Sequence, residues 1–166
     1  MGQAMIILGI DPGLASTGFG AIVCDRKTPS LLRCGYIKTS PANSVANRLF
    51  QIHCDMEQLI ETVRPQCVAV ENVFSLVRYP KAGILLGGVL GALYVTVQQH
   101  GIALVEISPK EVKNALVGFG SANKDQVKDT VQKLLGTDKV HSFHASDALA
   151  VALTAYYRNT TGRGSA

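Results

Sequence analysis

The sequence of 166 residues predicts one α/β domain in which helices flank a five-stranded mixed sheet. Three apolar, strand-like runs come first, and the short polar links between them indicate an antiparallel meander. Helices and short strands then alternate, which is typical of parallel crossover connections. An apolar share of 47% and a charged share of 17% exclude an intrinsically disordered chain. We therefore predict a single domain over residues 1–158 and a flexible tail over residues 159–166.

The first half of the chain contains the meander and one helix. Residues 5–10 form an apolar run that stops at the turn residues Asp11-Pro-Gly13, so the first strand ends there. Further strands are predicted over 18–24 and 31–39. Apolar side chains recur every three or four positions over Pro41–Val63, and this period indicates an amphipathic helix packed on the sheet.

The second half alternates between strands and helices. A short apolar strand over Cys67–Val70 leads to Glu71, and the composition of residues 72–81 favours an irregular, partly basic loop. A long apolar helix follows as far as about His100. The later elements are predicted to be a strand over 102–107, a short helix that opens at Ser108-Pro109, and helices over 123–135 and 143–158.

Charge, cysteines and hydropathy limit the compartment. Sixteen Lys and Arg against twelve Asp and Glu give a net charge of +4, which permits a polyanionic partner without requiring one. The four cysteines are widely spaced and form no metal-ligand pattern, which indicates a reducing compartment. No signal peptide is visible, and the longest uncharged apolar run, 84–97, is shorter than the roughly 20 residues of a membrane span. We expect a cytoplasmic protein without a membrane segment.

Four polar side chains form the candidate site. Asp11 follows the first strand and Glu71 ends the fourth, so both carboxylates emerge at one edge of the sheet if these strands are neighbours. His144 and Asp147 lie three positions apart at the start of the last helix and share a face. Each feature alone also has a plain structural interpretation, because Asp-Pro-Gly forms turns and an acid stabilises a helix N-terminus.

The joint placement of these side chains points to metal-dependent chemistry. Three carboxylates and an imidazole at one point repel one another and lose solvation unless a cation joins them. Oxygen ligands with one nitrogen suit Mg²⁺ or Mn²⁺ better than a thiolate-binding metal. Two such ions about 4 Å apart activate a water and stabilise the leaving oxygen of a phosphodiester. The sequence therefore favours phosphodiester hydrolysis.

Four segments, in the same order as in a known family, carry a resemblance. They are Ile7-Leu-Gly-Ile-Asp-Pro-Gly-Leu-Ala-Ser-Thr-Gly-Phe-Gly20, Val70-Glu-Asn-Val-Phe74, Val112-Lys-Asn-Ala-Leu-Val-Gly-Phe-Gly120 and Ser146-Asp-Ala-Leu-Ala-Val-Ala152. Together they resemble the RuvC family of bacterial Holliday-junction resolvases, crossover-junction endodeoxyribonucleases with a ribonuclease-H-like fold. The resemblance places Asp11, Glu71 and Asp147 on three acidic metal-binding positions of the family. His144 falls on a fourth such position, as a ligand or near-ligand.

The resemblance also implies the substrate, the metal ions and the partners. It implies a homodimer that binds a four-way DNA junction and nicks two opposed strands, leaving 5′-phosphate and 3′-hydroxyl ends. Two Mg²⁺ ions in each active site are expected, with Mn²⁺ as an alternative. Members of the family also work with the RuvA–RuvB branch-migration motor.

Five residues are candidate DNA contacts. Phe74 lies in the loop that also carries Arg78 and Lys81, and an exposed aromatic beside cations can stack on an unpaired base. The alternative is that this ring folds into the core. Lys113 and Lys124 match basic positions that lie near the scissile phosphate in the family, although lysines on helices are otherwise ordinary solvated groups.

A glycine stripe is the candidate dimer contact. Gly83, Gly87 and Gly91 recur every four residues in the long apolar helix. Each costs roughly 0.5 to 1 kcal/mol relative to Ala in a helix interior, so the stripe needs a packing reason. Packing on the chain's own sheet and packing across a dimer axis both supply one, and the resemblance favours the dimer for part of the helix.

Three rival interpretations remain at this point. Asp11-Pro-Gly13 with Gly18 and Gly20 is similar to the phosphate loop of actin-like ATPases and sugar kinases, but those proteins close two such domains over a nucleotide. The YqgF-like group, associated with ribosomal RNA processing, shares the first motif. A non-catalytic junction-binding module would leave the acidic set without a purpose.

Overall fold

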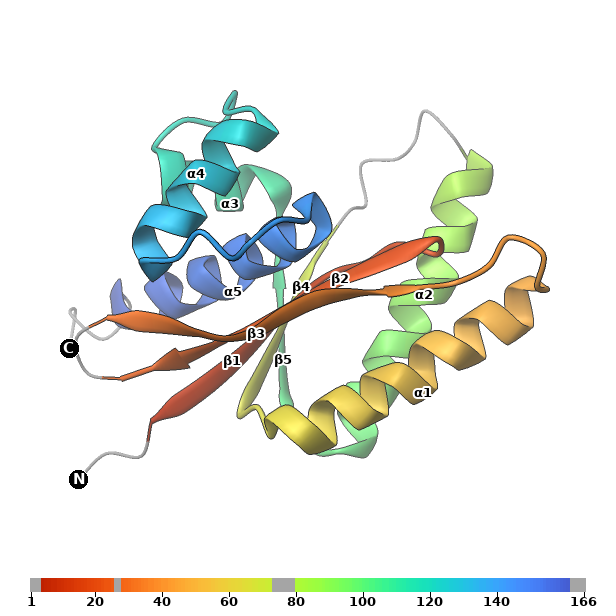
Figure 1. Cartoon of the computed structure of the whole chain (residues 1–166). Helices are drawn as coiled ribbons and strands as arrows, with labels where there is room; N and C mark the ends of the chain where they lie inside the picture. Colours follow the sequence, from red (N-terminus) through yellow and green to blue (C-terminus); the bar gives the residue numbers. More distant parts are fainter. Residues whose placement is uncertain (1–3, 26–27, 73–79, 162–166) are drawn as a thin grey trace.

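A computed structural model of the chain describes residues 4–25, 28–72 and 80–161. These residues form the strands β1 (Met5–Asp11), β2 (Ser16–Cys24), β3 (Pro29–Lys38), β4 (Cys67–Glu71) and β5 (Ala103–Ile107). They also form the helices α1 (Val45–Val63), α2 (Pro80–Gln99), α3 (Pro109–Val117), α4 (Lys124–Leu135) and α5 (Phe143–Thr161). The strands make one sheet, with α3, α4 and α5 on one face and α1 and α2 on the other (Figure 1).

The strand order in the sheet is β3-β2-β1-β4-β5. β1 pairs with β2, and β2 with β3, in antiparallel fashion, whereas β4 runs parallel to both β1 and β5. The meander therefore supplies one half of the sheet and the crossovers supply the other. This arrangement confirms the predicted five-stranded mixed sheet.

Side chains of the central strands alternate between the two faces, which produces two hydrophobic cores. In β1, Ile7 packs in the core beneath α5, whereas Leu8 and Ile10 pack in the core beneath α1 and α2. β4 follows the same pattern, with Cys67 on the α5 side and Val68 on the other. By this alternation the last residue of each of the two strands faces α5.

Capping residues determine where several helices begin. The Ser44 side chain accepts a hydrogen bond from the backbone of α1, so this helix begins at Val45 and not at Pro41 as predicted. Ser108 and Asn123 are N-caps in reciprocal capping boxes, and they start α3 and α4 where the sequence predicts.

Two other boundaries differ from the prediction. α2 already begins at Pro80, a residue suited to the first turn of a helix, so Lys81 lies in that turn rather than in a loop. α5 continues to Thr161, beyond the predicted end of the domain at residue 158. Arg158 anchors this last part because its guanidinium donates to the Glu106 carbonyl oxygen of β5 at 3.2 Å.

α2 is long and apolar enough to cross a membrane by length and composition alone. The helix as a whole has 20 residues, so it is longer than the uncharged apolar run over 84–97 that lies within it. The core helix of a globular domain passes the same test, and Val89, Leu93 and Val97 of α2 are fully buried against the sheet. The packed face of α2 thus belongs to the core of this domain.

Candidate active site

Asp11 and Glu71 are the last residues of β1 and β4, which are neighbouring parallel strands. Ile10 pairs with Val70, and both of these side chains pack into the core beneath α1 and α2. The two carboxyl groups that follow therefore turn toward α5. They are close enough for a proton on one carboxyl group to bond to the other. The carboxyl groups meet at one edge of the sheet, as the sequence predicts.

Two glycines allow α5 to approach this edge closely. A Cβ at Gly9 would overlap the carbonyl oxygen of Ala148, and a Cβ at Gly18 would overlap that of His144. Gly18 is also the cross-strand partner of Asp11. The missing side chains therefore set the distance between the first turn of α5 and the end of β1. The sequence alone places Gly18 in a strand and a motif but does not indicate this contact, because the helix that covers it is far away along the chain.

The first turn of α5 supplies His144 and Asp147. Nδ1 of His144 lies 3.2 Å from Oδ2 of Asp11. Nζ of Lys124 donates to Oδ2 of Asp147 at 3.1 Å, and this ion pair links α4 to α5. Only 16% of the Asp11 side chain and 19% of the Asp147 side chain are exposed. The four predicted side chains thus lie at one end of the sheet, and two of them already have basic partners.

Burial and repulsion between carboxylates favour a proton on the Asp11–Glu71 pair. Burial, followed by the charge of Asp147, raises the pKa of Asp11 to about 7. Burial, followed by the charges of Asp11 and Asp147, raises the pKa of Glu71 to about 7. The ammonium group of Lys124 opposes both shifts without cancelling them. Near neutral pH the pair therefore shares a proton unless another positive charge replaces it.

A pocket of about 220 Å³ opens beside the carboxylates, between α5 and the helices α3 and α4. Its walls combine Asp11, Glu71 and Asp147 with the side chains of Lys113 and Lys124. Acidic groups therefore face basic groups across a small space. Such a pocket accommodates a metal-bound phosphate, with carboxylates for the metal and ammonium groups for the phosphate.

The donor set fits a divalent cation. A cation that replaces the shared proton would relieve the repulsion that raises the pKa of Asp11 and Glu71. Within residues 4–25, 28–72 and 80–161, no group of three His, Cys, Asp or Glu side chains is already arranged to hold a metal ion. Asp11 pairs with His144 and Asp147 pairs with Lys124 instead. Binding a cation between the carboxylates therefore requires the Asp11–His144 contact and the Asp147–Lys124 ion pair to open or rearrange.

The predicted DNA contacts fall into three groups. Lys113 on α3 and Lys124 on α4 line the pocket, which brings both to the carboxylates. Lys81 is exposed in the first turn of α2. Phe74 and Arg78 lie outside the residues that the structure describes.

The glycine stripe lies partly on an open face of α2. Gly87 and Gly91 are exposed, and a Cβ at either position would meet no atom of the described residues within 4 Å. Packing on the chain's own sheet therefore does not explain these two glycines. Gly83, one turn earlier, is partly buried. The open face also carries exposed apolar side chains, with 76% of Ile84 and 58% of Val95 accessible.

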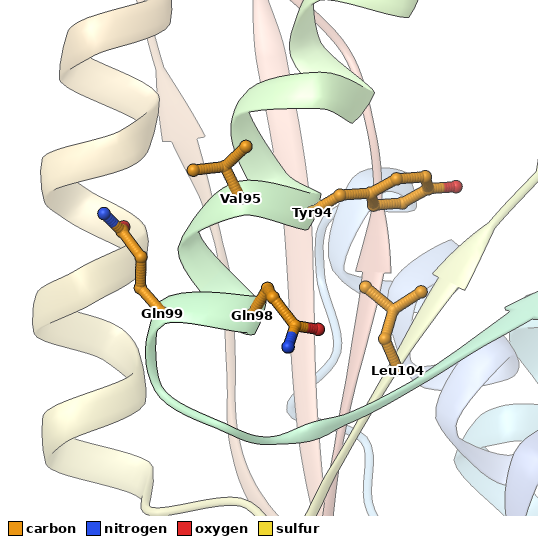
Figure 2. Close-up of a pocket in the computed structure, with 5 residues that line it drawn as sticks. All are labelled: Tyr94, Val95, Gln98, Gln99 and Leu104. Atoms are coloured by element: carbon orange, nitrogen blue, oxygen red, sulfur yellow. The ribbon is translucent and has the colours of Figure 1, made fainter.

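An apolar pocket adjoins the end of this face. Figure 2 shows Tyr94, Val95, Gln98 and Gln99 of α2 around it, with Leu104 of β5 on its other side. The pocket has a volume of about 540 Å³. Val95 belongs to both features, so the open face of α2 continues into the pocket.

The sequence matches a family model described as "Crossover junction endodeoxyribonuclease RuvC" over residues 7–155. Relatives that bear this name include a protein of Pelodictyon phaeoclathratiforme, 39% identical over 150 residues, which are 90% of this chain and 78% of that protein. A protein of Prochlorococcus marinus with the same name is 39% identical over 155 residues, 93% of this chain and 97% of that protein.

Solved structures share the fold. The Thermus thermophilus RuvC structure in complex with a Holliday junction substrate matches with a TM-score of 0.89 and 33% identity, over 95% of this chain and 96% of that one. The yeast mitochondrial Holliday junction resolvase Ydc2 matches with a TM-score of 0.63 and 12% identity, over 95% and 83% of the two chains, and so shares the fold alone. These matches confirm the ribonuclease-H-like fold that the sequence resemblance implies.

Proposed function

The chain belongs to the RuvC family of crossover junction endodeoxyribonucleases, and from this membership we propose that it resolves four-way (Holliday) DNA junctions. The reaction is paired, symmetrical hydrolysis of phosphodiester bonds that depends on a divalent metal. A Holliday junction is also the substrate in the complex of the T. thermophilus relative. The YqgF-like alternative, a nuclease of ribosomal RNA, is not favoured, because the family model and the relatives are those of RuvC.

The observation that carries the proposal is the meeting of Asp11, Glu71 and Asp147 around one pocket that Lys113 and Lys124 also line. Carboxylates are the ligands of divalent cations, and lysines hold phosphate groups. A module that only binds junctions has no use for buried carboxyl groups whose pKa is raised by that burial. A metal-dependent hydrolase does have a use for them.

The residues of the site take distinct parts in the proposed reaction. Asp11, Glu71 and Asp147 would hold the cations, with His144 as a ligand or near-ligand beside Asp11. Two Mg²⁺ ions, or Mn²⁺ in their place, would activate the attacking water and stabilise the leaving oxygen. Lys124, which donates to Asp147, would be free to contact the scissile phosphate once a cation held that carboxylate. A neutral imidazole at His144 keeps the site less negative than a fourth carboxylate would.

The proposed reaction also determines the DNA ends that cleavage leaves, and the symmetry of the junction favours a homodimer. Departure of the 3′-oxygen leaves 5′-phosphate and 3′-hydroxyl ends that a ligase can join. A homodimer suits a nearly two-fold symmetric junction, because each active site then meets an equivalent strand.

The open face of α2 is the proposed dimer interface. Gly87 and Gly91 allow another helix to approach closely, and Gly83 continues the stripe one turn earlier in the same helix. Ile84 and Val95 offer exposed apolar area on the same helix. A second copy of α2 would cover both features.

Further DNA contacts and a partner protein are proposed outside the carboxylate pocket. Phe74 would stack on an unpaired base at the junction centre, with Arg78 and Lys81 on nearby phosphates. The RuvA–RuvB motor is the proposed partner by family resemblance, and a cytoplasmic location is proposed because the RuvC relatives act on DNA.

The test is a nicking assay on a synthetic four-way junction with Mg²⁺ or Mn²⁺. We expect paired nicks from the parent protein. Asp11→Asn should bind the junction but nick it at least about a hundredfold more slowly, because a cation ligand is lost. Asp125→Asn, which changes an exposed carboxylate of α4, is the matched control and should nick like the parent. Absence of paired nicks from the parent would refute the function, and equal nicking by Asp11→Asn would remove Asp11 from the mechanism.

A further inference from the structure

A second polar pocket adjoins the carboxylate pocket on the side of the edge strand β3. It has a volume of about 550 Å³, and its walls include Tyr36, Lys38, His141 and His144. His144 also contacts Asp11 at 3.2 Å, and Asp11 lines the carboxylate pocket. The two pockets therefore meet at the Asp11–His144 pair. We call the second one the β3 pocket.

The strand register aligns the β3 pocket with the carboxylates. Asp11 pairs with Gly18 across β1 and β2, and Gly18 pairs with Tyr36 across β2 and β3. Directly paired residues point to the same face of a sheet, so Tyr36 lies on the α5 face in the same row as Asp11. Two strand spacings separate them, which is about 10 Å. Lys38 follows two positions after Tyr36 and so shares its face.

Within the described part of the chain, the β3 pocket has basic and no acidic side chains in its wall, whereas the carboxylate pocket has three acidic ones. Lys38 and His141 are exposed in it, and none of the described residues that line it is acidic. The Lys38 side chain has no hydrogen bond or ion pair to any residue in the described ranges. The hydroxyl of Ser16, also in the wall, is buried without a partner among the same residues. The carboxylate pocket suits cations, whereas this one suits an anion.

An aromatic ring stands beside the Lys38 ammonium group and the His141 imidazole. Half of Tyr36 is exposed, and its ring centroid lies 6.3 Å from that of His144 at a tilt of 52°. The two rings are therefore not stacked on each other, and Tyr36 has a face open to a ligand. An open aromatic face next to basic side chains is the combination that binds a nucleotide of a single strand.

We propose that the β3 pocket binds a nucleotide adjacent to the scissile phosphate on the nicked strand. Lys38 and His141 contact its phosphate, and Tyr36 stacks on its base or sugar. The strand then crosses the end of the sheet from β3 toward β4 and presents the next phosphate to the carboxylates. This inference rests on the proposed function and deepens it, because it assigns residues that position the strand.

The first experiment measures binding without cleavage. A fluorescent four-way junction is titrated with protein in EDTA at several salt concentrations. Lys38→Ala should weaken binding about three- to tenfold and lower the slope of log affinity against log salt by about one. Lys133→Ala removes the same charge about 14 Å further along α4 than Lys124, and it should change neither quantity. Equal affinity and slope for Lys38→Ala and the parent would overturn the proposal.

A second experiment locates the contact. Single methylphosphonate groups, which are uncharged, replace one phosphate at a time along the nicked strand. At the phosphate that Lys38 contacts, Lys38→Ala should cause no further loss of affinity, whereas the two changes should add elsewhere. Non-additivity next to the scissile phosphate supports the proposal. Additive losses at every neighbouring position refute it, even if the parent nicks junctions as the proposed function requires.

The aromatic contact has its own test. Tyr36→Ala should weaken junction binding about fivefold or more, whereas Tyr36→Phe should retain it because stacking needs only the ring. Phe50→Ala removes another exposed aromatic, on α1, and should have no effect. Loss of binding in Tyr36→Phe as large as in Tyr36→Ala would exclude stacking, and unchanged binding in Tyr36→Ala would exclude the contact. If the parent itself nicks no junction, the proposed function fails first.

Discussion

Gly9 and Gly18 lie beneath α5 on one face of the sheet, whereas Gly87 and Gly91 lie on the open face of α2, on the other side. A Cβ at either of the first two would overlap a backbone oxygen of α5. A Cβ at either of the last two would have no neighbour within 4 Å among residues 4–25, 28–72 and 80–161. The residue type is the same, but the first pair has its neighbour within the chain and the second pair does not.

The role of a glycine therefore depends on which atoms lie where its side chain would be. Beneath α5 the missing Cβ atoms allow close packing, and this packing brings His144 to Asp11. On α2 each glycine costs about 0.5 to 1 kcal/mol relative to Ala, with no compensating contact in the described part of the chain. The proposed dimer would supply the compensation, because a second copy of α2 could pack on these two glycines.

The largest effect is expected at Gly18. In Gly18→Ala the added methyl group cannot fit against the His144 carbonyl oxygen, so the first turn of α5 must move away from Asp11. A displacement of about 1 Å at a catalytic group costs about a hundredfold in rate, and overpacking destabilises by about 1 to 3 kcal/mol. Nicking rates and urea denaturation measure the two effects.

Gly91→Ala makes the same substitution on the open face and is the control for folding. It should leave the packing of the chain unchanged. Nicking by Gly18→Ala at the rate of the parent would show that close packing of α5 does not position the site.

The next largest effect is expected on the oligomeric state. Gly91→Arg places a long charged side chain on the open face, where the chain itself has room for it. The monomer should therefore keep its circular dichroism spectrum, while the dimer dissociates at a concentration at least about tenfold higher, since a buried unpaired charge is costly at an interface. Sedimentation at several concentrations measures this change. An unaltered dimer would place the interface elsewhere on the molecule.

The order of strands and helices could be predicted from the sequence because each element has a local pattern. The apolar run before Asp11 and the helical period before Val63 depend only on nearby residues. The start of α1 was wrong because the hydrophobic period does not show that Ser44, rather than Pro41, caps the helix. The start of α2 at Pro80 was missed because Pro and Lys in sequence suit a loop equally well.

Two residues of the candidate site could be predicted because they lie at the ends of strands. Asp11 and Glu71 follow two apolar strands, and a crossover connection makes those strands neighbours. The contact of Gly18 with α5 and the alignment of Tyr36 with Asp11 were not predictable in this way. Both depend on register across the meander and on a helix that follows more than a hundred residues later.

The buried carboxyl groups beneath α5 also predict that the free energy of unfolding depends on pH. The pKa of Asp11 and of Glu71 is about 7 in the folded chain, against ordinary values of 3.8 and 4.5. The folded protein therefore binds more protons than the unfolded chain between about pH 4 and 7. Without metal, the contribution of this pair to the free energy of unfolding should fall as the pH rises through that window, because the folded chain must then lose protons that the unfolded chain has already lost.

Glu71→Gln should reduce this fall, because it removes one of the two carboxyl groups that must lose a proton. Glu61→Gln, at an exposed position of α1, is the control and should follow the parent. Denaturation in EDTA from pH 5 to 8 measures the slopes, and added Mg²⁺ should restore stability at pH 8. Identical slopes for Glu71→Gln and the parent would contradict the assignment of the raised pKa to this pair.

The smallest effect is expected at the open glycines themselves. It concerns the cost of glycine to the stability of the helix, measured apart from any effect on dimer formation. In a dimer, the unfolding of the chain is linked to dissociation, so a change at Gly87 alters both. Gly91→Arg provides a monomeric background in which Gly87→Ala acts only on the helix. There the substitution should stabilise the chain by about 0.5 to 1 kcal/mol, because Ala loses less backbone entropy and its methyl group meets no neighbour. Destabilisation in that background would mean that the chain itself packs against Gly87, and the reason for assigning this face to a second copy would be lost.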